Sequence, residues 1–164
     1  MNDQEKVRNR WRILILLYIL VIVKLIIFKY PLSILRVIME NWGSESIRSG
    51  VHSANFVPFK TIKMYIRYYE SLNSFENLFG NILIFIPFGF FLPKAFVKMN
   101  QLFWTLLFSG CFIIDIELFQ LVTRFGEFDV DDIILNLLGV VIGFSLYHLI
   151  HYILKKSRHM RSRK

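Results

Sequence analysis

Polar and charged side chains gather in one short part of an otherwise very apolar chain, residues 115–143, which read DIELFQLVTRFGEFDVDDIILNLLGVVIG. Carboxylates, amides and one arginine lie there on both sides of the point where two apolar segments meet. Charged groups inside a bilayer are energetically costly, and where they occur they usually serve a function. This stretch therefore predicts a functional site beside the membrane surface.

Two kinds of chemistry fit these residue types. A guanidinium pairs with phosphate and carboxylate groups through two hydrogen bonds, so Arg124 could hold an anionic headgroup. Glu117, Asp129 and Asp132 could instead hold a divalent cation for phosphate chemistry. No nucleophile with an adjacent base is visible in the sequence, so we expect a binding site rather than a catalytic one, with no cofactor and no resident metal.

Helical spacing predicts that the polar residues lie at one depth. Asn81 and Asn136 each fall about 5 Å inside the start of a predicted helix, at 1.5 Å per residue. Glu117 falls about 7 Å inside the end of a third by the same rise. Because Glu117, Gln120 and Arg124 are spaced i, i+3 and i+7, they share one face of that helix.

A second face lies on the last apolar segment. Its members, at spacings i, i+4, i+7 and i+11, are Asp132, Asn136, Gly139 and Gly143. Glycines on one face let a neighbouring helix approach closely, so we expect the third and fourth helices to pack tightly. We expect Glu117 to face Asn136 in this contact. We expect Arg124 to face Asp129 or Asp132.

The predicted ligand-binding residues are Asn81, Glu117, Gln120, Arg124, Asp129, Asp132 and Asn136. In the competing interpretation these groups only hold helices together. Interhelical hydrogen bonds in bilayers contribute on average less than about 1 kcal/mol each, so helix association alone does not require so many polar groups. We therefore favour a pocket that opens to the outer leaflet.

The elements that position these residues are predicted to be membrane helices. The chain of 164 residues has the length of one domain. With 55% hydrophobic and 16% aromatic residues, it has more apolar surface than a soluble domain of this size can bury. The apolar segments are residues 13–28, 78–97, 102–122 and 133–154. Each approaches the length of about 20 residues that spans a bilayer, which predicts an all-α integral membrane protein with a bundle of four transmembrane helices.

Charge predicts the orientation. Cytoplasmic segments are enriched in Lys and Arg, and this assigns residues 1–12 to a basic cytoplasmic N-terminus, residues 13–154 to the four-helix membrane domain and residues 155–164 to a cytoplasmic polybasic tail. The tail reads KKSRHMRSRK and contains no acid, so we expect it to contact anionic lipid of the inner leaflet. The net charge of +8 resides largely in such segments, and we expect no nucleic-acid partner. The protein is thus predicted to be a multi-pass protein of the cell membrane.

The connection between the first two segments, residues 30–76, is long and outside the membrane in this topology. Ile62, Tyr65 and Ile66 recur there at helical spacing, with Tyr69 and Leu72 continuing the pattern. This pattern predicts an amphipathic helix lying at the outer membrane surface. A loop helix packed over the bundle is the alternative. Residues 55–59, NFVPF, precede it, and the proline favours an extended residue before it and a tight turn at the interface.

The order of these motifs resembles the VanZ-like membrane proteins, a family named for a teicoplanin-resistance protein. The resemblance rests on KLIIFK at residues 24–29, NFVPF at 55–59, NILIFIPFGF at 81–90, ELFQ at 117–120, and Asp129, Asp132, Asn136, Gly139 and Gly143. It implies a small polytopic protein of Gram-positive-type cell envelopes, linked to reduced susceptibility to lipoglycopeptide antibiotics.

The resulting hypothesis is a non-catalytic membrane protein that binds a lipid-linked envelope component or a lipoglycopeptide at the outer leaflet. Lowered susceptibility to teicoplanin-type antibiotics would follow from that binding. One alternative is a membrane enzyme acting on a lipid phosphate or isoprenoid. The other is a structural scaffold with no ligand.

Overall fold

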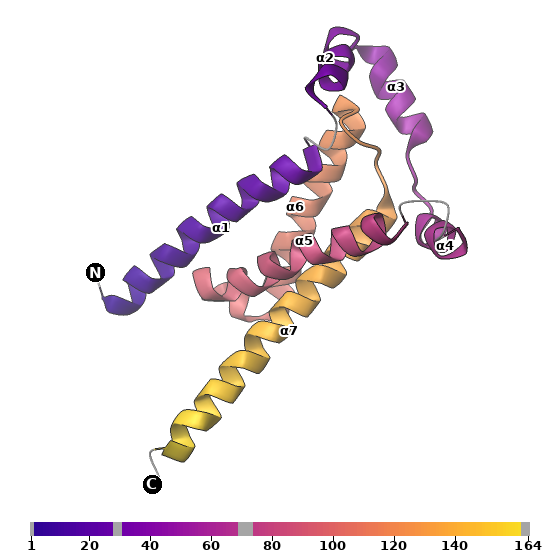
Figure 1. The fold of residues 1–164 in the computed structure, drawn as a ribbon. Helices are drawn as coiled ribbons and strands as arrows, with labels where there is room; N and C mark the ends of the chain where they lie inside the picture. Colours follow the sequence, from indigo (N-terminus) through magenta and orange to yellow (C-terminus); the bar gives the residue numbers. More distant parts are fainter. Residues whose placement is uncertain (1, 28–30, 69–73, 162–164) are drawn as a thin grey trace.

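The computed structural model describes residues 2–27, 31–68 and 74–161, and these residues form an all-helical fold (Figure 1). The elements are α1 (Asp3–Ile27), α2 (Leu32–Glu40), α3 (Ser44–Ser53), α4 (Lys60–Arg67), α5 (Ser74–Ala95), the 3-10 turn η1 (Lys98–Asn100), α6 (Leu102–Thr123) and α7 (Val130–Arg161). Within the described ranges, extended pairing is confined to one isolated parallel bridge between Asn55 and Asp129. The predicted all-α class is confirmed.

Three helices in the described part of the chain are long and apolar enough to cross a membrane. They are Glu76–Ala95 in α5, Leu102–Thr123 in α6 and Val130–Ser157 in α7. The predicted count of four is not confirmed, because α1 is not among them. Its first turns carry charged residues from Asp3 onward, and the last residue of the predicted segment 13–28 lies outside the described residues.

The closest helix pair is α5 with α7, and glycines allow the contact. A side chain at Gly139 or Gly143 of α7 would overlap the carbonyl oxygens of Ile82 and Ile86 on α5. Gly89 of α5 is equally close to the backbone of α7. The expectation that this glycine face packs on the third membrane helix is wrong: it packs on the second. Helices α5 and α7 approach each other closely because small residues lie on the contacting faces of both helices.

Aromatic residues fill the core between these helices and α1. Phe85 and Phe88 of α5 are fully buried and meet edge to face, with ring centroids 5.8 Å apart. Tyr18 of α1 donates a hydrogen bond of 2.7 Å to the carbonyl oxygen of Ile84. Trp11 lies 5.6 Å from Phe91, centroid to centroid. Helix α1 is therefore attached to α5 along several turns.

In its described residues, 31–68, the connection between α1 and α5 contains three short helices, where one was predicted. Helix α3 packs on the end of α6, where Gly50 lies against the carbonyl oxygen of Leu121. Helix α4 contacts both α5 and α7, as the alternative of a helix packed over the bundle predicted. Of the residues used to predict it, Tyr69 and Leu72 lie outside the described residues. Figure 1 shows α4 beside the start of α7, so the connection returns to the bundle there.

Candidate functional site

The N-terminus of α7 organises the polar residues that the sequence places together. Asp129 directly precedes the helix and accepts a hydrogen bond of 2.8 Å from the backbone N–H of Asp131, an N-cap interaction. The backbone N–H of Asp129 in turn donates to a carboxylate oxygen of Glu117 at 3.0 Å. Glu117 is 2% exposed and comes from α6. The end of one membrane helix is thereby joined to the start of the next.

Asn55, in the segment between α1 and α5, binds the residues at the N-terminus of α7. Its backbone N–H donates to the carbonyl of Phe128 at 2.8 Å, and its carbonyl accepts from the N–H of Val130 at 3.0 Å. Its side-chain amide donates to Asp129 at 2.8 Å. The NFVPF motif was predicted only to make a tight turn at the interface. The structure shows that its asparagine binds the residues at the start of α7.

Asp131 is a structural residue that the sequence analysis missed. It is completely buried, and its two carboxylate oxygens accept backbone N–H groups at the start of α4: those of Phe59, of Thr61 at 2.7 Å and of Ile62 at 3.1 Å. Phe59 adopts a left-handed conformation, with φ of 63°, which turns these N–H groups toward the carboxylate. The first N–H groups of a helix have no partner within the helix, so Asp131 of α7 caps α4 from outside it.

A small polar cavity of about 170 Å³ lies under α4. Its lining residues are Tyr65, Asn77, Asn81, Gln120, Gly126, Glu127, Asp129 and Asp132. They come from α4, α5, α6, the turn before α7 and the first turn of α7. Of the predicted ligand-binding residues, Asn81, Gln120, Asp129 and Asp132 line this cavity. Of the three residues predicted to share one depth, Asn81 lines it, and Glu117 and Asn136 do not. Asn81 donates a hydrogen bond of 2.6 Å to Asp132 across the cavity wall.

Gln120 is the most informative lining residue. It is 8% exposed, and its side chain makes no hydrogen bond to any described residue. The side chain lines the cavity, so its amide is available to a ligand there. A ligand that accepts from the amide nitrogen or donates to its oxygen would provide the hydrogen-bond partner that the described residues do not.

The cavity is acidic. Glu127, Asp129 and Asp132 line it, and none of the described lining residues is a lysine or arginine. Burial, followed by the negative charges of these three carboxylates, raises the pKa of the Tyr65 phenol above its ordinary value of 10.0. The phenol therefore stays protonated and can donate a hydrogen bond. Such a lining favours a ligand that presents ammonium, amide or hydroxyl groups over one that presents a bare phosphate.

Arg124 does not take part in this cavity, which corrects its expected pairing with Asp129 or Asp132. Its guanidinium donates to the hydroxyl of Ser53 at 2.6 Å and to the carbonyl of Ser49 at 3.5 Å, both on α3. It lines a separate cavity of about 390 Å³. The reason is its backbone: Arg124 follows the last turn of α6 with φ of 64°. The i, i+7 relation to Glu117 requires a continuous helix, and the helix has ended.

Asn136 also differs from its expected position. It is 2% exposed, and its side-chain oxygen has no hydrogen-bond partner among the described residues. The hydrogen bond recorded for Glu117 comes from the backbone of Asp129, so the expected Glu117–Asn136 pair is not formed. Within the described ranges, Glu117, Asp129 and Asp132 do not form a group of three arranged for a metal ion.

Comparisons with known proteins agree with the motif order. The family model described as VanZ/LLP1 matches residues 15–151. Protein VanZ of Enterococcus faecium is 28% identical over 154 residues, an alignment that covers 92% of this chain and 78% of that protein. No solved structure matches the chain.

Proposed function

Because the chain belongs to the VanZ/LLP1 family, we propose that it is a cell-envelope membrane protein that binds a lipid-linked envelope component or a lipoglycopeptide. Binding at the outer leaflet would lower susceptibility to teicoplanin-type antibiotics. The observation that carries this proposal is the polar cavity under α4, whose buried Gln120 has no hydrogen-bond partner in the described structure. Helix association alone gives no reason for an unsatisfied amide beside an open space.

The arrangement of the helices supports an outer-leaflet position for the cavity. It lies at the starts of α5 and α7, around Asn81 and Asp132. The basic residues near the start of α1 and the end of α7 belong to the other end of the bundle, since Arg12 of α1 donates to the carbonyl of Ala95 at the end of α5. By the positive-inside rule that other end is cytoplasmic. We therefore retain α1 as a fourth span, with both termini in the cytoplasm.

The lining defines the ligand chemistry further. The ligand would donate hydrogen bonds to Asp132, Glu127 and the oxygen of Gln120, and it would accept from Tyr65. The cavity of about 170 Å³ suits part of a ligand, such as one amino or hydroxyl-bearing group, with the remainder outside in the headgroup region. Arg124 supports α3 in this scheme instead of contacting the ligand.

The test compares growth inhibition by teicoplanin in a susceptible Gram-positive host that expresses wild type, Gln120→Met, Gln101→Met or an empty vector. Methionine keeps the length of the Gln120 side chain and removes its hydrogen-bonding groups. Gln101 is exposed at the start of α6, and its side chain makes no cap hydrogen bond, so it is the matched control. We expect protection by wild type and Gln101→Met that is lost in Gln120→Met at equal membrane abundance.

Two further readouts separate the competing functions. Isothermal titration of purified protein with teicoplanin should show binding that Gln120→Met weakens. Full protection by Gln120→Met at normal abundance would refute a binding role for the cavity. Loss of protection only through lower abundance would favour a scaffold, and turnover of a lipid phosphate by the purified protein would favour an enzyme.

A further inference from the structure

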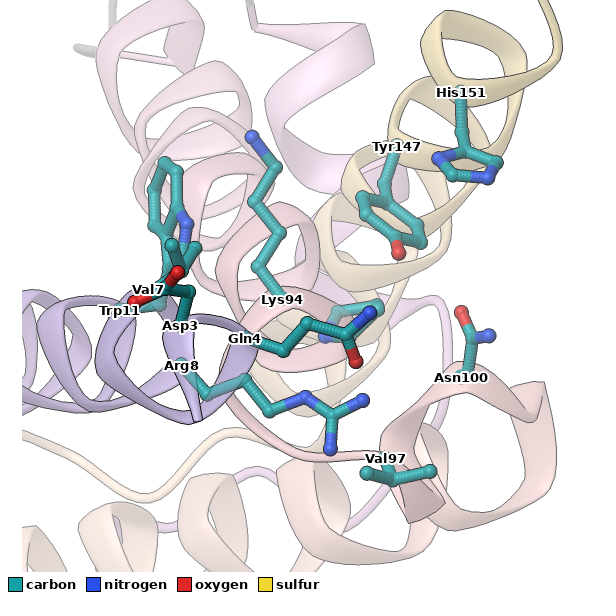
Figure 2. A pocket seen from close by; sticks show the side chains of 11 residues that line it. Asp3, Gln4, Val7, Arg8, Trp11, Lys94, Val97, Asn100, Tyr147 and His151 are labelled. Carbon is teal, nitrogen blue, oxygen red and sulfur yellow. The ribbon is translucent and has the colours of Figure 1, made fainter. Parts of the chain in front are cut away.

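A second cavity, of about 600 Å³, lies at the other end of the bundle. Its walls are the start of α1, the end of α5 with the segment after it, and the second half of α7 (Figure 2). Besides Asp3 and Gln4, the lining residues able to bind a polar group are Arg8, Trp11, Lys94, Asn100, Tyr147 and His151. The proposed function uses none of them, so this cavity needs its own explanation.

Two cations without a carboxylate partner line the cavity. Arg8 makes no hydrogen bond or ion pair to any described residue, and Figure 2 shows its guanidinium extending from α1 toward Val97. The Lys94 ammonium lies 4.1 Å from the centroid of the Trp11 ring. Asp3 is the one acid among the described lining residues, and it pairs with Lys6 at 3.4 Å. The cavity therefore carries excess positive charge.

Uncharged groups complete a site for a headgroup. Tyr147 and His151 line the cavity from α7, and Asn100 lines it from the segment after α5 (Figure 2). Tryptophan and tyrosine are enriched where membrane proteins meet the headgroup layer, because one part of each ring system is apolar and the other polar. A guanidinium binds phosphate oxygens in pairs, and an ammonium adds a point charge. Trp11 and Tyr147 can contact the start of an acyl chain below such a phosphate.

The position along the helices agrees with the inner headgroup layer. From Asp132 in the first cavity to His151 in the second is about 28 Å along α7, at 1.5 Å per residue. From Asn77 to Lys94 along α5 is about 26 Å by the same rise. Both distances approach the thickness of roughly 30 Å of a bilayer hydrocarbon core. The two cavities are thus separated by one membrane thickness.

We propose that the cavity between α1, α5 and α7 binds the phosphate-bearing headgroup of an anionic phospholipid of the inner leaflet, with Arg8 as the phosphate-binding residue. Lys94, held over the Trp11 and Phe90 rings, adds positive charge to the cavity. This site is separate from the polybasic tail at residues 155–164, which attracts anionic lipid without selecting a position. Because α1, α5 and α7 all contribute to the cavity, the bound lipid would also join α1 to the remainder of the bundle.

The experiment is native mass spectrometry of the full chain in a neutral detergent, titrated with phosphatidylglycerol, phosphatidylcholine or inorganic phosphate. The variants are Arg8→Gln and Lys94→Gln, and the control is Arg10→Gln, which removes the same charge from an exposed position of α1 outside the cavity. We expect a bound phosphatidylglycerol whose dissociation constant rises at least about tenfold in Arg8→Gln, the loss typical of one charge-assisted hydrogen bond. Arg10→Gln should stay within about twofold, as screened surface charges do.

Each outcome decides the proposal. Saturable phosphatidylglycerol binding that is weakened by both cavity variants supports it. Inorganic phosphate that competes and depends equally on Arg8 supports the phosphate chemistry and identifies a soluble source. Equal affinity for phosphatidylcholine overturns it, as does equal weakening by Arg8→Gln and Arg10→Gln. Thermal unfolding of each variant without lipid shows whether a loss of binding reflects a loss of fold, and Lys94→Gln provides the second test if Arg8→Gln is unstable.

Discussion

Replacement of Asp131 by alanine should release α4 from the bundle. The carboxylate is fully buried and accepts three backbone N–H groups, those of Phe59, Thr61 and Ile62. Each hydrogen bond to a charged group contributes about 1.5–3 kcal/mol, and each buried donor left unsatisfied costs a similar amount. The total cannot exceed the free energy that holds α4 in place, because the released N–H groups bind water. We therefore expect a loss of about 3 kcal/mol, the value of one to two such bonds.

Hydrogen–deuterium exchange with mass spectrometry measures this loss directly. A loss of about 3 kcal/mol increases the open population roughly a hundredfold, since 1.4 kcal/mol corresponds to tenfold. Amides of α4 should exchange faster by that factor in Asp131→Ala, while those of α5 should change little. Glu127→Ala is the control, because it removes an exposed acid near α4 that accepts none of the N–H groups at the start of α4. Unchanged exchange in α4 of the Asp131 variant would show that the cap does not hold this helix.

Three further predictions follow from other contacts. Gly143→Ala should destabilise the fold by about 1–3 kcal/mol, typical of overpacking, because the new side chain overlaps a backbone carbonyl of α5. Thermal unfolding in detergent measures this loss. Gly80→Ala is the control and should show no such loss, because its added carbon meets nothing within 4 Å. Arg124→Ala should free α3 from the end of α6, because it removes the hydrogen bond to Ser53. Limited proteolysis should then cleave α3 faster than in wild type. Equal cleavage rates would show that Arg124 does not hold α3 in place. Tyr65 should ionise above pH 10 in a difference absorbance titration against Tyr65→Phe, because its pKa is raised in the folded state. Its stabilising contribution is therefore present below pH 10 and is lost as the pH rises through the folded-state pKa. Glu127→Gln should lower the titration midpoint, and a wild-type midpoint at or below 10 would argue against a buried acidic environment.

Asp129, Asp131 and Asp132 have different roles in the structure, and the sequence pattern does not distinguish these roles. All three lie in one acidic turn and look alike in sequence. In the structure Asp129 caps α7, Asp131 caps α4 and Asp132 binds Asn81 beside the cavity. Successive residues at a helix start point about 100° apart, so each meets a different neighbour. Only the arrangement of those neighbours determines which acid is structural.

Features that depend on local periodicity and composition could be predicted from the amino-acid sequence. Apolar length and the 3.6-residue repeat predicted the long helices and the presence of α4, because rise and rotation per residue are constant within a helix. The motif order also identified the family. Charge asymmetry predicted two unlike ends, one acidic and one basic.

Which helices pack together, and which partner each polar group binds, became clear from the three-dimensional fold. The glycine face of α7 could pack against any neighbouring helix. It packs against α5 because Gly89 of α5 also allows close approach of the two backbones. Arg124 belongs to the face of Glu117 only while α6 continues, and the left-handed residue at the helix end directs it to α3. Asp131 is joined to residues 59–62 across some seventy positions of chain. Such long-range pairs have no periodic signature, because they depend on how whole helices pack, and helix packing depends on surfaces contributed by distant segments.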